Sequence, residues 1–106
     1  MNVFAPYCAA PITNKKIPKL KLPNNSCDTH IHVFGPEKHY PYQDDRSYTP
    51  RDCGPEKIFI LHDKLNVERA VIVQASVHGT DNRAILDMVK LSPKKLRAVA
   101  SVNQNI

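Results

Sequence analysis

The residues with the clearest chemical potential are two histidines one residue apart, in the string Asp28-Thr-His30-Ile-His32. Residues two apart on a β-strand project to the same face. Two imidazoles on one face can bind a single divalent ion such as zinc, or can jointly polarise a carbonyl group. A pair with this spacing also occurs by chance in many chains, and the alternative is two histidines with ordinary structural hydrogen bonds.

An alternating pattern over residues 26–34 predicts the strand that must position this pair. The apolar set is Cys27, Thr29, Ile31 and Val33, and the residues between them are Asp28, His30, His32 and Phe34. A period of two is typical of a strand, so we expect Asp28, His30 and His32 to share one face. The Gly35-Pro36 pair then ends the strand. Because the pair closes an apolar strand and precedes this turn, we interpret it as part of a functional site.

The rest of the chain predicts helices and strands in alternation. A long proline-containing loop over residues 37–54 leads to a helix from about Pro55 to Leu65, and an apolar β-branched run over residues 70–75 follows as a buried strand. A second helix, capped by Thr80 or Asp81, precedes a third strand over residues 96–102. Its expected core stripe is Ile85, Leu86, Met88, Val89 and Leu91. This order predicts the α/β class, with a parallel sheet and right-handed crossovers.

The composition is that of one globular domain: 106 residues, of which 42% are hydrophobic and 24% charged. Residues 1–25 are rich in proline and lysine, so we expect an extended leader there and a domain over residues 26–106. No apolar run is long enough to cross a membrane, and the first residues do not fit a signal peptide. Three widely spaced cysteines without a C-x-x-C pair favour a reducing compartment, and we expect the cytoplasm.

The formal net charge of +5 raises the question of a nucleic-acid partner. Its distribution argues against one, because the lysines concentrate in the leader and the other basic residues are mixed with acidic ones. We therefore expect neither a nucleic acid nor a membrane as partner. The positive charge instead favours a small anionic substrate.

Three strings of residues resemble a known family. They are D-T-H-I-H-V-F-G-P from Asp28, P-Y-x-x-x-R-x-Y-T-P over residues 41–50 and V-I-V-Q-A-S-x-H-G-T-D-N-R over residues 71–83. Together they resemble the amidohydrolase superfamily, in the branch that contains 2-pyrone-4,6-dicarboxylate lactonase. The resemblance covers residues 26–102. It implies the N-terminal β-α-β-α-β portion of a (β/α)8 TIM-type barrel, whose active site lies at the C-terminal ends of the strands.

The activity that the resemblance implies is hydrolysis of a lactone by attack of water on the ester carbonyl. His30 and His32 would be catalytic, donating hydrogen bonds to the carbonyl and stabilising the oxyanion, while Tyr48 and Ser76 would bind the substrate. A divalent metal such as zinc is optional, with His30 and His32 as its ligands. The general base would be an aspartate on an eighth strand, outside these residues.

Other polar residues are expected to have structural roles. His78 is expected to tether the backbone of its loop rather than line the site, and Asp28 either orients a histidine or the loop, or is a plain strand residue. The remaining assignments are helix-start hydrogen bonds for Asp81, Asn82 and Arg83, surface positions for His39 and His62, and structural thiols for Cys27 and Cys53.

The length of the chain limits the activity to be expected of it. A whole barrel takes about 250 residues, so we expect a fragment, a truncated product, or one part of a split enzyme that a second polypeptide completes. Alone, the chain should hydrolyse lactones poorly or not at all, because the base and the carboxylate-binding arginines lie outside it. The alternatives are a metal-dependent amidohydrolase or decarboxylase of the same superfamily, a non-catalytic remnant and, least favoured, a nucleic-acid-binding module.

Overall fold

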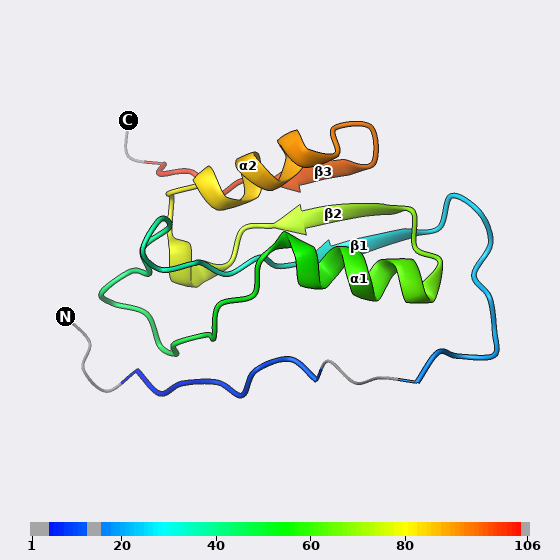
Figure 1. The fold of residues 1–106 in the computed structure, drawn as a ribbon. Helices are drawn as coiled ribbons and strands as arrows, with labels where there is room; N and C mark the ends of the chain where they lie inside the picture. The colour runs from blue at the N-terminus through cyan, green and yellow to red at the C-terminus, as the bar shows by residue number, and fades with distance from the viewer. Residues whose placement is uncertain (1–4, 13–15, 105–106) are drawn as a thin grey trace.

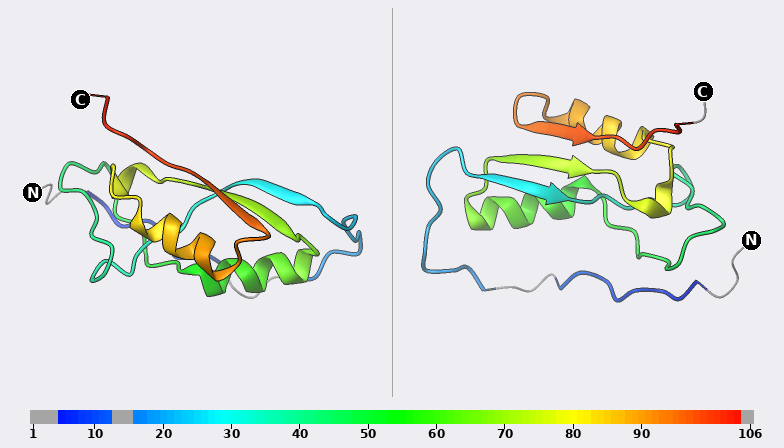
Figure 2. Two further views of the ribbon diagram at one scale, coloured as in Figure 1. Left: turned by 90° about the horizontal axis from the view of Figure 1, so that it is seen from above. Right: turned by 180° about the vertical axis from the view of Figure 1, so that it is seen from behind.

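The computed structural model describes residues 5–12 and 16–104, which form a three-stranded parallel sheet with two helices on one face (Figures 1 and 2). The elements in chain order are β1 (Cys27–Ile31), α1 (Pro55–Leu65), β2 (Arg69–Val73), the short 3-10 helix η1 (Ser76–His78), α2 (Arg83–Leu91) and β3 (Leu96–Val99). The strands lie in the order β1-β2-β3, and both pairings are parallel. The predicted β-α-β-α-β order is therefore confirmed.

The hydrophobic core lies between the sheet and the two helices. Ile72, on the central strand β2, is fully buried and belongs to one apolar cluster with Ile85 and Met88 of α2 and Ile58 of α1. Ala70 is the second buried residue of β2. Since residues two apart on a strand share a face, Ala70 and Ile72 mark the helix-covered face of the sheet. The opposite face is open (Figure 2, left). Val99, on that face of the edge strand β3, is 52% exposed.

Helix α1 has the predicted bounds. Pro55 occupies its first turn, where the missing N–H costs nothing. The helix ends where Asn66 adopts a left-handed conformation with φ of 58°, which asparagine tolerates better than most residues. The side-chain amide of Asn66 also donates to the carbonyl of Leu22 at 2.7 Å. The end of α1 is thereby attached to the segment that leads into β1.

The start of α2 differs from the prediction, because neither Thr80 nor Asp81 is the residue before its first turn. Asn82 holds that position and makes no side-chain cap. Its amide nitrogen donates to Thr80 O and Ser101 O, at 3.1 and 2.9 Å. Asp81 accepts the backbone N–H of Arg83 at 3.3 Å and also pairs with its guanidinium at 2.7 Å. The predicted helix-start cluster is confirmed. Asp81 caps the N–H of the first helical residue, although it lies one residue before the N-cap position, and Thr80 is not the cap.

The apolar stripe of α2 is narrower than predicted. The buried residues of the helix are Ala84, Ile85 and Met88, whereas Leu86 and Leu91 are 50% and 65% exposed. A helix that packs on a single sheet buries only the positions three or four apart that face it. Leu86 lies beside that face and Leu91 ends the helix, so including both in the core was wrong.

Strands β1 and β3 are shorter than predicted, because the residues that follow them form hydrogen bonds outside the sheet. Phe34 leaves the sheet and exchanges backbone hydrogen bonds of 3.0 and 2.8 Å with Cys53 of the long loop. Ser101, after β3, donates its N–H to the side chain of Asn82 at 3.0 Å. The predicted strands over residues 26–34 and 96–102 therefore end early, at Ile31 and Val99.

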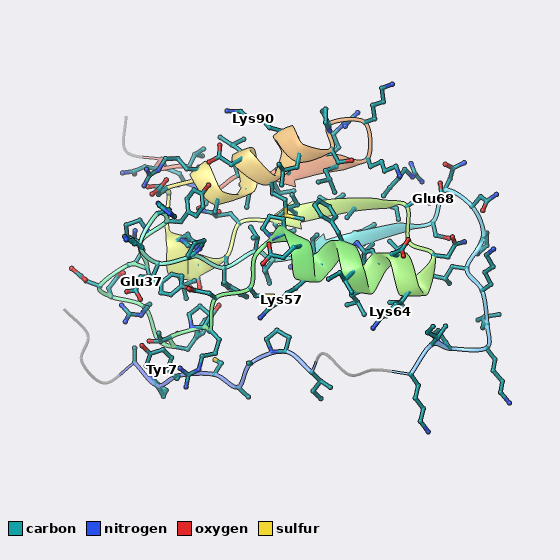
Figure 3. The ribbon with its side chains drawn as sticks, in the orientation of Figure 1. Tyr7, Glu37, Lys57, Lys64, Glu68 and Lys90 are labelled. Atoms are coloured by element: carbon teal, nitrogen blue, oxygen red, sulfur yellow. The ribbon has the colours of Figure 1, made fainter. Side chains whose placement is uncertain are left out.

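The leader packs along the long loop that follows β1. Thr49 of the loop donates its N–H to Pro6 O at 2.7 Å and accepts the N–H of Cys8 at 2.9 Å. The guanidinium of Arg51 lies 4.2 Å above the ring of Tyr7, which is labelled on the leader in Figure 3. Residues 1–4, 13–15 and 105–106 lie outside the described residues, and so does the part of the leader prediction that concerns them. No helix of the described chain is long and apolar enough to cross a membrane.

Candidate active site

The two histidines of the motif lie together at the C-terminal end of β1. Their ring centroids are 5.1 Å apart, and the ring planes meet nearly edge to face at 86°. His30 is exposed and His32 is half-buried, with the ring of Phe34 5.9 Å further on. The predicted pairing of the two imidazoles is therefore present in the structure.

The predicted Asp-His-His face is wrong, because β1 contains an irregularity. Asp28 pairs with Ala70 and Ile31 pairs with Ile72, so β1 has one residue more than β2 over this stretch. Asp28 and Ile31 therefore both belong to the helix-covered face, on which Ala70 and Ile72 lie. An extra residue of this kind re-aims the side chains around it. His30 and His32, on either side of Ile31, consequently project from the open face, without Asp28.

The imidazole of His32 is fixed by one strong hydrogen bond. Its Nδ1 lies 2.8 Å from the carbonyl oxygen of Val73, at the end of β2. A carbonyl oxygen can only accept, so Nδ1 carries the proton and donates. In the neutral ring, Nε2 then holds a lone pair and acts as an acceptor or a metal ligand. Nε2 donates a hydrogen bond only when the ring is an imidazolium.

Asp28 is paired on the other side of the sheet with His62, which was wrongly predicted to be a surface residue. The Asp28 carboxylate lies 3.0 Å from Nε2 of His62, which is only 7% exposed. Its second oxygen accepts the N–H of His30 at 3.4 Å. The helical spacing of His62 from Ile58, which faces the core, was the sequence signal that could have placed it inside. The expectation that Asp28 orients a histidine is met at His62.

Replacing His62 with leucine is expected to destabilise the fold by about 1–2 kcal/mol, because it removes one charge-assisted hydrogen bond between β1 and α1. The cost stays moderate because the Asp28 side chain is 40% exposed and can recover water. His39→Leu, at an exposed position, is the control and should change stability little. Urea unfolding of the three proteins measures the difference. Equal midpoints for both variants would show that the pair contributes nothing.

The predicted substrate-binding residues lie at the same end of the sheet as the histidines, on two different connections. Tyr48, from the loop after β1, packs against a buried cluster that includes Ala75 and Val77, on either side of Ser76. Ser76 is exposed and opens η1. Phe34 also packs on this cluster. Within the described residues, no hydrogen bond joins Tyr48 or Ser76 to either histidine, so the structure brings the four to one end without joining them.

The histidine pair lies on the open face of the sheet, away from two cavities on the helix side. Cavities of about 310 Å³ and 280 Å³ lie on the helix side, one beside Tyr40 and α2, the other between α1 and β3. Neither is lined by His30 or His32. In the described part of the chain, no three His, Cys, Asp or Glu side chains are grouped so that they could hold a metal ion. The two histidines can therefore supply two ligands at most, and further ligands must come from outside these residues.

His78 is buried and tethers the backbone of its loop by hydrogen bonds, as predicted. It is 1% exposed, and Nε2 accepts the N–H of Gly35 at 3.3 Å. Nδ1 lies 3.3 Å from the carbonyl oxygen of Pro41. Burial lowers the pKa of His78 below its ordinary value of 6.5. The residue therefore ties η1 to the loop after β1 in the neutral form.

Sequence comparison relates the chain to lactone hydrolases. The sequence model of the amidohydrolase family matches residues 27–106. A 2-pyrone-4,6-dicarboxylate hydrolase of Comamonas testosteroni is 44% identical over 93 residues, which is 88% of this chain and 30% of that protein. A 4-sulfomuconolactone hydrolase of Rhizobium radiobacter is 37% identical, over 89% of this chain and 31% of its own length. The chain thus spans about a third of the curated relatives that it matches.

Solved structures show the same fold. A probable 2-pyrone-4,6-dicarboxylic acid hydrolase of Acinetobacter baumannii, crystallised with citric acid, superposes with a TM-score of 0.70 at 30% identity. The match covers 77% of this chain and 30% of that structure. An apo structure from Agrobacterium tumefaciens gives 0.72 at 27% identity, over 83% of this chain and 32% of its own. The three strands and two helices thus correspond to part of a TIM-type barrel, as the resemblance implied.

Proposed function

Because the chain belongs to the amidohydrolase family, we propose that it contributes one part of the active site of a lactone hydrolase that acts on a small anionic cyclic ester similar to 2-pyrone-4,6-dicarboxylate. The observation that carries this proposal is the contact of His30 and His32, with ring centroids 5.1 Å apart, on the open face at the C-terminal end of β1. Catalytic groups of barrel enzymes lie at this end of the strands.

The two imidazoles stabilise the oxyanion that forms when water attacks the ester carbonyl. The Val73 carbonyl holds His32 through Nδ1 and so directs Nε2 away from the sheet edge. Donation from Nε2 to the substrate requires the imidazolium form of the ring, because Nδ1 already donates to Val73. Tyr48 and Ser76, at the same end, hold the substrate.

The general base comes from outside these residues. Asp28 is the carboxylate nearest to the pair in sequence, but it lies on the helix-covered face and hydrogen-bonds His62 at 3.0 Å. It therefore cannot activate water on the open face. The remaining strands of the barrel supply the base, whether they belong to the same polypeptide or to a second one. The net charge of +5 favours an anionic substrate, and the concentration of lysines in the leader argues against a nucleic-acid partner.

A metal-dependent hydrolase or decarboxylase of the same superfamily is the second candidate, and one observation favours it. Histidines that bind a metal commonly donate their other ring nitrogen to a carbonyl oxygen, as Nδ1 of His32 does to Val73. His30 and His32 would then hold a divalent ion such as zinc, which supplies Lewis-acid polarisation of the carbonyl.

Three cysteines free of disulfides in the described chain fit a reducing compartment, and we propose the cytoplasm.

A chimera tests the proposed function, because the chain covers only 30% of the Comamonas relative. Residues 27–106 replace the matching segment of that hydrolase, and hydrolysis of 2-pyrone-4,6-dicarboxylate is followed by the loss of pyrone absorbance. We expect turnover by the chimera and none above background by the 106-residue chain. An unrelated amide substrate serves as the negative control.

Three further outcomes bear on the two candidates and on the expected position of the base. Zinc that copurifies with the chimera and is lost on His30→Ala favours the metal-dependent enzyme, and calorimetric zinc titration of the same variant checks it without an activity assay. A well-folded chimera that hydrolyses no lactone contradicts the proposed function. Turnover by the 106-residue chain alone would overturn the expectation that the base lies outside it.

A further inference from the structure

The turn that carries Ser76 is fastened to two other segments. Directly after β2, the side-chain amide of Gln74 donates to Gly79 O and to Asp81 O, both at 2.9 Å. These bonds close the chain over η1. From the loop after β1, Gln43 donates its N–H to Val77 O at 2.6 Å and its side-chain amide to His78 O at 3.4 Å.

The side chain of His78, in η1, forms hydrogen bonds to the loop after β1. Its Nε2 lies 3.3 Å from Gly35 N and its Nδ1 lies 3.3 Å from Pro41 O, at the two ends of the first turn of that loop. Since the amide of Gly35 can only donate and the carbonyl of Pro41 can only accept, the ring must be neutral with its proton on Nδ1. The geometry thus fixes both the charge and the tautomer of a side chain that is 1% exposed.

The loop that His78 holds is the one that carries Tyr48. Tyr42 packs against the His78 ring with centroids 5.1 Å apart, and it belongs to the cluster against which Tyr48 packs. Ser76 lies two residues before His78. The segments that present the proposed substrate-binding residues therefore meet at one buried imidazole.

We propose that His78 is a positioning residue that couples the loop of Tyr48 to the turn of Ser76, so that the two substrate-binding side chains keep one relative position. The inference rests on the proposed function only for the identity of these two residues as substrate-binding. The coupling itself is a property of the fold. His78 touches no reacting group and acts through the backbone that it holds.

Acid is expected to release the coupling, because an imidazolium cannot accept the Gly35 N–H. The charged and titratable groups around the ring are the Asp81 carboxylate, which is paired with Arg83, and the Tyr42 hydroxyl, which donates to Asp52 at 2.8 Å. The loss of hydration on burial disfavours the imidazolium more than the negative charge of Asp81 favours it, so the pKa of His78 lies below 6.5. The contribution of His78 to stability is thus complete above pH 6.5 and declines as the pH falls toward its folded pKa, because the unfolded chain binds the proton first.

Three substitutions in the full chain separate the two bonds. In His78→Gln the side-chain oxygen can replace Nε2 as acceptor for Gly35, and in His78→Asn the amide nitrogen can replace Nδ1 as donor to Pro41. His78→Leu keeps the approximate volume and loses both bonds. Amide hydrogen exchange by NMR reports Gly35 and Gln43, whose N–H groups cross between the segments, and the amides of β2 report the core.

In the wild type at neutral pH, we expect proton-bearing Nδ1 and bare Nε2 in the nitrogen spectrum of His78. His78→Leu should speed exchange at Gly35 and Gln43 at least about tenfold and leave β2 unchanged, since only a local opening is made easier. His78→Gln should restore protection at Gly35. Equal acceleration of β2 and the loop would assign His78 to general stability, and unchanged protection in His78→Leu would refute the coupling. If His78→Leu does not fold, protection of Gly35 in His78→Asn equal to that in His78→Gln overturns the proposal.

Titration of the chimera with 2-pyrone-4,6-dicarboxylate distinguishes this inference from the proposed function. If the chimera with His78 intact shows no shift at Tyr48 and Ser76 but the exchange results hold, the coupling stands and the assignment of the substrate fails. If both residues shift together in that chimera, they should shift independently in its His78→Leu variant. Joint shifts in the His78→Leu chimera, with unchanged affinity, would contradict the proposal.

Discussion

Replacing His32 with alanine in the chimera is expected to lower kcat for lactone hydrolysis by about 10²–10³-fold, the usual cost of one oxyanion-stabilising group. The ring is held by the Val73 carbonyl at 2.8 Å, so it is already oriented when the charge develops on the substrate. A group held in this way stabilises the transition state without reorganisation. The loss should therefore appear mainly in kcat, with a smaller change in KM.

The control for His32→Ala is His39→Ala, at an exposed position of the loop after β1. It removes an imidazole without touching the pair and should leave kcat within about twofold, as expected for a surface position. His30→Ala should resemble His32→Ala, because the two rings are in contact. A kcat of His32→Ala equal to that of His39→Ala would mean that the pair is structural.

Replacing Ile72 with alanine is expected to cost about 2–5 kcal/mol of stability, since a buried side chain is removed and a cavity is left. Ile72 is the fully buried residue of the central strand and contacts the cluster shared by both helices. The free energy of unfolding of a small domain is only about 5–15 kcal/mol. This single change should therefore remove a large part of it and shift the unfolding midpoint to lower urea concentration. Circular dichroism during urea unfolding measures it.

Leu86→Ala is the matched control for Ile72→Ala, because it removes an aliphatic side chain of the same size. Leu86 is 50% exposed and was wrongly predicted to lie in the core. Its truncation should cost about 1 kcal/mol or less. A larger loss at Leu86 than at Ile72 would mean that α2 packs through a different face from the one described.

Much of the fold could be predicted from local patterns in the sequence. Helix α1 has its predicted bounds because Pro55 marks the first turn, and β2 stands out as a β-branched apolar run. The predicted bounds of β1, α2 and β3 are less accurate. The ends of these elements depend on bonds between distant residues, such as the one between Asn82 and Ser101, which no local pattern contains.

The candidate site was predicted in its residues but not in its geometry. The alternation around His30 and His32 looks regular, and nothing in it signals the extra residue that moves Asp28 to the helix-covered face. The partner of Asp28, His62, lies 34 positions away. The roles of Tyr48 and Ser76 came from resemblance to a family, and they stay predictions, supported by their place at the end of the sheet where the histidines lie.

The most direct test of the role of the histidine pair is the steady-state rate of 2-pyrone-4,6-dicarboxylate hydrolysis by the chimera, with His30 and His32 intact and with both replaced by alanine. We expect hydrolysis by the intact chimera and a loss of at least about 10²-fold in the folded double variant. Equal rates in the two proteins, or no hydrolysis by a folded intact chimera, would contradict it.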